Sequence, residues 1–72
     1  MIKPEIGLAF ELYYGEDNVN NNPFNEIRAI VDDLVLVLYS KTKGGRAGYN
    51  LMYIDAFNMR VEDENVIVLN KN

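Results

Sequence analysis

The first stretch of the chain, residues 5–14, alternates large apolar side chains with smaller or polar ones. The large residues occupy every second position: Ile6, Leu8, Phe10, Leu12 and Tyr14. A period of two is typical of a β-strand with one buried face. Turn-forming asparagines dominate the following residues, Gly15 to Asn25. We therefore expect a half-buried strand followed by a loop.

Residues 24–39 fit two patterns. In the first, Asn22 caps a helix that has Pro23 at its first position and covers residues 23–33. In the second, two strands flank a two-residue turn at Asp32-Asp33. Isoleucine and valine are frequent in this stretch, and β-branched residues favour sheet over helix. We therefore expect two strands, with the helix as the alternative.

The apolar run Leu34–Tyr39 offers large side chains to both faces of a strand. An exposed edge strand of this kind would pair with other chains and aggregate. We therefore expect it to be a central strand, to be covered by a helix, or to be buried between copies of the chain. The last alternative predicts a homo-oligomer formed through Leu34–Tyr39.

A hairpin is expected in the second half of the chain. Residues 41–48 include three glycines and separate two apolar runs, which is typical of a hairpin loop. The strand that follows places Tyr49, Leu51 and Tyr53 on one face.

The remaining residues predict one short helical turn and a last strand. Asp55 is expected to cap the turn at Asp55–Met59, and Val66–Leu69 is the expected strand. Residues 70–72 are expected to fray. The whole pattern predicts an all-β fold of five to six strands, as a small antiparallel meander or an SH3-like or OB-like barrel. A helix at residues 23–33 would make the fold α+β instead.

Composition limits how the 72-residue chain is stabilised and where it is found. This length supports one domain, residues 1–72. There is no cysteine and no histidine, so disulfides are excluded, and we expect no metal or cofactor. The chain lacks both the apolar stretch of a signal peptide and the run of about 20 apolar residues that a membrane helix needs. We therefore expect a cytoplasmic protein without membrane contact.

The absence of histidine and cysteine excludes most catalytic mechanisms. There is no imidazole to act as a base and no thiolate to act as a nucleophile. Groups of carboxylates remain, all in predicted turns: Glu16/Asp17, Asp32/Asp33 and Glu62/Asp63/Glu64. Acidic residues in turns are normally solvated, so we expect a protein without enzymatic activity.

Charge is distributed unevenly along this chain, whose formal net charge is −4. The loop after residue 40 is basic and carries no acid. Together with nearby tyrosines it gives six candidate partner-binding residues: Tyr39, Lys41, Lys43, Arg46, Tyr49 and Tyr53.

Two kinds of partner fit these candidates. Cations beside aromatic rings suit single-stranded nucleic acid, although a dedicated nucleic-acid binder is usually basic. Tyrosine is enriched at protein interfaces, and an open sheet edge can accept a strand. Equally, loop cations often only improve solubility, and tyrosines often only cover a thin core. We expect a protein partner, with nucleic-acid binding and homo-oligomer formation as alternatives.

Three segments of the chain form a pattern of their own: residues 27–33, the Tyr39-Ser40-Lys41 tripeptide, and the tyrosine-containing strand that ends near Phe57. Together they resemble short uncharacterised proteins encoded by bacteriophages. The resemblance covers half of the chain and includes no catalytic motif. It implies a phage or mobile-element protein that binds and modulates a host enzyme complex, such as the transcription machinery, in the host cytoplasm.

Overall fold

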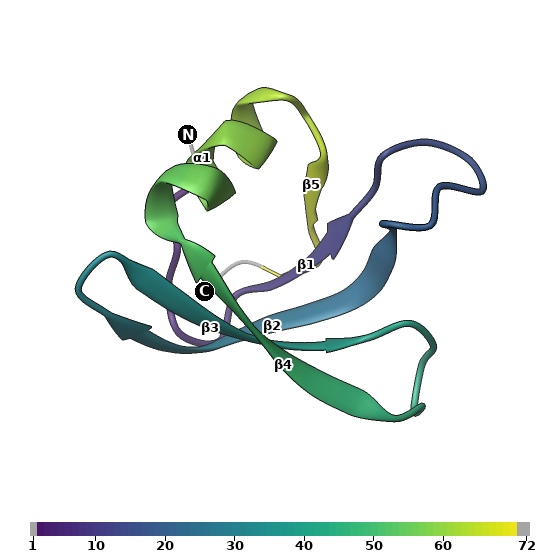
Figure 1. Cartoon of the computed structure of the whole chain (residues 1–72), viewed down its shortest axis with the longest axis horizontal. Helices are drawn as coiled ribbons and strands as arrows, with labels where there is room; N and C mark the ends of the chain where they lie inside the picture. The colour runs from purple at the N-terminus through teal and green to yellow at the C-terminus, as the bar shows by residue number, and fades with distance from the viewer. Residues whose placement is uncertain (1, 71–72) are drawn as a thin grey trace.

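The chain forms one five-stranded antiparallel sheet with a short helix on one side of it (Figure 1). The computed structural model describes residues 2–70. In chain order the elements are β1 (Ala9–Leu12), β2 (Asn22–Val31), β3 (Leu34–Ser40), β4 (Ala47–Tyr53), α1 (Ile54–Glu62) and β5 (Val66–Val68). The strand order across the sheet is β4-β3-β2-β1-β5, so α1 carries the chain from one edge of the sheet to the other.

The predicted all-β meander is confirmed. β2, β3 and β4 follow one another through two hairpins, and residues 23–33 form most of β2 and its turn instead of the alternative helix. The sheet is open, with β4 and β5 at opposite edges, so the chain adopts the meander and not the barrel. The run Leu34–Tyr39 lies in β3 between two paired neighbours, as expected for a central strand.

The turn between β2 and β3 consists of Asp32 and Asp33, as the sequence predicts. Asp32 has a positive φ of 54°. Aspartate tolerates this left-handed conformation better than most residues, because its short polar side chain can form local hydrogen bonds. This tolerance explains how a hairpin turn without glycine can form here.

The first strand is shorter than the alternation of residues 5–14 predicts. Only Ala9–Leu12 are in β1, since Gly7 turns the chain with a φ of 92° and Ile6 is 65% exposed. Leu8, Phe10 and Leu12 are buried, so the buried face is the expected one.

A β-bulge interrupts the alternation in β2. The register with β3 shifts between Ile27, which pairs with Val37, and Ala29, which pairs with Leu36. Arg28 is the extra residue, and the phase of the side chains changes after it. As a result Ile27 is fully buried and Ile30 packs against the core, whereas Val31 is exposed.

The helix α1 is longer than the expected turn, and its cap differs. Tyr53 occupies the N-cap position without a side-chain hydrogen bond, so the prediction that Asp55 caps the helix is wrong; Asp55 lies in the first turn. The Ile54 backbone N–H donates to the Asp33 carbonyl (2.8 Å), which fixes the start of α1 to the β2–β3 turn. Near the other end of α1, Arg60 Nε donates to the Tyr14 hydroxyl (2.7 Å).

The core lies between α1 and one face of the sheet. Phe57 of α1 is fully buried, and its ring meets Phe10 of β1 edge to face, with centroids 5.4 Å apart and an interplanar angle of 79°. Edge-to-face aromatic pairs contribute about 0.5–1.5 kcal/mol beyond the area that they bury. Ile27 of β2 and Val35 of β3, which are also fully buried, complete the centre of the core.

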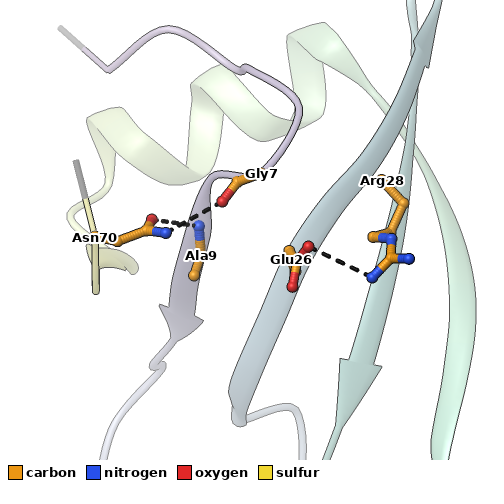
Figure 2. A network of polar contacts seen from close by, with 5 residues as sticks. All are labelled: Gly7, Ala9, Glu26, Arg28 and Asn70. Atoms are coloured by element: carbon orange, nitrogen blue, oxygen red, sulfur yellow. Dashed lines mark hydrogen bonds and ion pairs between the residues drawn. The ribbon is translucent and has the colours of Figure 1, made fainter. Parts of the chain in front are cut away.

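Asn70 joins the C-terminal segment to β1 (Figure 2). Its Oδ1 accepts from the Ala9 backbone N–H (2.7 Å), and its Nδ2 donates to the Gly7 carbonyl (3.2 Å). Fraying was expected from residue 70 onward, and this expectation is wrong for Asn70. Residues 71–72 lie outside the described part of the chain.

Replacing Phe57 tests the central position of α1. We expect Phe57→Ala to lower the free energy of unfolding by about 3–5 kcal/mol, because it opens a large cavity in the core. A domain of this size has a total stability of roughly 4–11 kcal/mol, so the loss is severe. Met59→Ala is the control on the same helix, since Met59 is 58% exposed. Urea unfolding followed by circular dichroism measures both variants, and equal midpoints would contradict this description of the core.

The β2–β3 turn gives a second prediction. Asp32→Val should destabilise the fold by about 1–2 kcal/mol, because a β-branched residue disfavours a positive φ. Asp33→Val is the matched control, as Asp33 is exposed and its φ is not positive. Thermal unfolding compares the two variants, and a larger effect at Asp33 would show that the backbone of Asp32 is not under this constraint.

Candidate functional site

The two faces of the sheet differ in what covers them. Val35 and Val37 of β3 point to the side of α1 and are buried, whereas the alternate residues Leu34, Leu36 and Leu38 point to the other side and are only half-buried. No other described element covers that second side, which we call the outer face (Figure 1). The outer face is therefore where apolar side chains remain accessible.

Six large side chains form a continuous patch on the outer face. Each leucine of β3 pairs in register with a residue of β4: Leu34 with Tyr53, Leu36 with Leu51, and Leu38 with Tyr49. The three residues of β4 are strongly exposed, at 61% for Tyr53, 64% for Leu51 and 63% for Tyr49. We call these six residues the leucine–tyrosine patch.

A shallow groove continues the leucine–tyrosine patch toward β1. It has a volume of about 240 Å³, and its lining residues are Ala9, Phe24, Asn25, Glu26, Leu38, Tyr39, Ser40, Ala47 and Leu69. Apolar surface therefore continues beyond the six residues of the patch, with the charged residue Glu26 beside it.

The β3–β4 hairpin places cations beside one end of the patch. Lys43 and Arg46 are exposed, and neither forms an ion pair within residues 2–70. Lys41 is used differently, since its Nζ donates to the carbonyls of Val19 (3.1 Å) and Asn21 (2.9 Å). Lys41 therefore holds the β1–β2 loop in place by hydrogen bonds. Of the three predicted cations, Lys43 and Arg46 remain available to contact a partner.

The structure separates the tyrosines that the sequence grouped together. Tyr49 and Tyr53 share the outer face, as predicted. Tyr39 follows Val35 and Val37 in the alternation of β3, and it packs against the core. Its ring also lies over Gly48, where an added Cβ would stand 3.2 Å from the tyrosine ring.

The six partner-binding residues predicted from the sequence do not include the leucines of the patch, although one alternative places the run Leu34–Tyr39 in a contact between copies of the chain. The available signal was the run Leu34–Tyr39, which is apolar at every position except its tyrosine hydroxyl. A central strand buried on one face still exposes its other face unless a second layer covers it. Which side of β3 stays open depends on the side that α1 covers, and the pattern of the strand alone does not determine this.

In residues 2–70, no three His, Cys, Asp or Glu residues are grouped so that they could hold a metal ion. In the same part of the chain, no helix has the length and apolar character needed to cross a membrane.

Comparison with protein-family models, curated proteins and solved structures gives no significant match for this chain. Function is therefore inferred from the surface of the chain itself.

The role of Lys41 gives a testable prediction. Lys41→Ala removes two hydrogen bonds to the β1–β2 loop, each with a net contribution of about 0.5–1.5 kcal/mol. We expect faster proteolytic cleavage within residues 15–21, measured by mass spectrometry of the fragments. Lys43→Ala is the control, because it removes the same charge from the same hairpin without touching that loop. Equal cleavage rates in the two variants would contradict the fastening role of Lys41.

Proposed function

We propose that this chain is a non-enzymatic protein-interaction module whose binding surface is the leucine–tyrosine patch. The observation that carries the proposal is the exposure of Tyr49, Leu51 and Tyr53, which are adjacent on one face of one strand. Isolated exposed apolar residues are ordinary, but contiguous apolar patches on small proteins mark interaction sites.

The residue types of the patch suit a protein partner. Tyrosine provides a large, rigid contact area with a polar tip and is enriched among the residues that dominate binding energy. Leucines at the centre supply apolar area that a partner can remove from water, at roughly 25 cal/mol per Å². A patch of this kind gains binding energy mainly by desolvation.

Lys43 and Arg46 give the patch a charged rim. Protein interfaces commonly combine an apolar, aromatic centre with polar residues at the edge. Rim charges contribute to the rate and selectivity of association more than to affinity. These two cations therefore favour a partner surface that carries acidic residues beside an apolar area.

The patch lies on hydrogen-bonded strands and not on a loop. β3 and β4 pair without a break from Leu34 and Tyr53 to Ser40 and Ala47. A preformed surface loses less conformational entropy on binding than a flexible one. The resemblance to bacteriophage proteins supports a host complex, such as the transcription machinery, as the partner.

Affinity capture from a bacterial lysate tests this proposal. The immobilised chain should retain a partner, and Leu51→Lys should lower the retained amount at least about tenfold, because a charge replaces the centre of an apolar contact. Met59→Lys is the matched control, since it introduces the same charge at an exposed apolar residue of α1. Quantitative mass spectrometry compares the three samples. Equal retention by Leu51→Lys and the unmodified chain would refute the proposed surface.

A further inference from the structure

The pattern of side chains in the leucine–tyrosine patch is symmetric along the strands. On β3 it reads leucine, leucine, leucine, and on β4 it reads tyrosine, leucine, tyrosine. Both rows are the same in either direction, with Leu36 and Leu51 paired at the middle. A two-fold axis that crosses the strands at this pair would bring the patch onto a second patch of identical chemistry.

The charges beside the patch are not symmetric in this way, because the two ends of the strands carry charges of opposite sign. Lys43 and Arg46 lie in the hairpin beyond the Ser40 end of β3, whereas Asp32 and Asp33 form the turn at the other end. All four residues are exposed, and none of them has an ion-pair partner within residues 2–70. Because β3 extends over seven residues, the two charged ends are roughly 20 Å apart.

The symmetric side chains and the opposite charges at the two ends together favour a second copy of the chain as the partner, in one orientation. If two copies met face to face with their β3 strands parallel, the cations of one copy would lie over the cations of the other. If the strands were antiparallel, Lys43 and Arg46 of each copy would lie over Asp32 and Asp33 of the other, at both ends of the contact. Like charges in direct opposition are costly, so electrostatics favours the antiparallel orientation.

We infer that the leucine–tyrosine patch is covered by a second copy of this chain, packed face to face with antiparallel strands. This inference rests on the proposed function, because it concerns the same surface; a second copy on the patch would compete there with the host partner. The two sheets would lie about 10 Å apart, which is the normal spacing of packed sheets and leaves room for one interdigitated layer of side chains.

The contacts follow from the two-fold symmetry of such a dimer. Leu36 and Leu51 lie at the centre, each opposite its own counterpart, and Tyr49 of each copy lies near Tyr53 of the other. This type of contact is isologous, which is the commonest way in which identical chains associate. A second copy also adds a layer to a small domain whose sequence has no cysteine for disulfides.

Sedimentation equilibrium of the full chain, from low to high micromolar concentration, tests the dimer. We expect a mass that rises from that of the 8.3 kDa chain to twice that value. Leu51→Lys should remain a monomer over the same range, and Met59→Lys should behave like the unmodified chain. A chain that stays monomeric at high micromolar concentration, or a dimer that persists in Leu51→Lys, would overturn the inference.

Charge reversal tests the orientation. Arg46→Glu and Asp33→Lys should each weaken the dimer about fivefold, because each affects two symmetric charge contacts of a few tenths of a kcal/mol or more. In the parallel orientation the same two changes would each remove like-charge opposition and strengthen the dimer. A dimer that either variant leaves unchanged or strengthens would therefore show that the antiparallel orientation is wrong.

The lysate experiment separates the failure of this inference from the failure of the proposed function. A monomeric chain that loses a captured partner on Leu51→Lys would overturn the inference and leave the proposed function standing. A dimer that is insensitive to Leu51→Lys, with capture also unchanged, would overturn both. Circular dichroism of each variant verifies that it is folded, which the exposure of all substituted residues favours.

Discussion

The contact between Phe57 and Phe10 is the interaction on which the rest of the structure depends. A single nine-residue helix supplies the second layer of the core, and Phe57 is the residue of that helix that is fully buried. Because the chain has one such helix among its described residues, it can cover one face of the sheet and not both. The accessible outer face is therefore a direct consequence of how the core is built.

Much of the fold follows from the sequence because the relevant signals are local. The alternation around Phe10, the Asp32-Asp33 turn and the apolar run of β3 each depend on neighbouring residues, and each predicts the type of its element correctly, although β1 is shorter than the alternation predicts. The bulge at Arg28 was not predictable in this way, because it is defined by the pairing of β2 with β3. Its effect on which isoleucines are buried is a property of two strands together.

In the candidate site, too, some features follow from neighbouring residues and others depend on contacts between residues far apart in the sequence. The shared face of Tyr49 and Tyr53 follows from a period of two within one strand. The placement of Tyr39 on the opposite face depends on which side of β3 α1 covers, and the role of Lys41 depends on carbonyls about 20 residues earlier in the chain. Residues that are close in sequence therefore have different roles in the fold: Tyr39 packs against the core, Lys41 holds the β1–β2 loop, and Tyr49 and Tyr53 lie on the outer face.

The position of β1 between β2 and β5 has a consequence for folding during synthesis. The hairpins from β2 to β4 join neighbouring segments, but β1 pairs with β5 across more than fifty residues. Contacts between such distant segments slow folding, because a long loop must close before they form. On the ribosome, the edge of β1 that pairs with β5 stays unpaired until residues 66–68 have emerged, so until then the nascent chain has an open strand edge beside its future core.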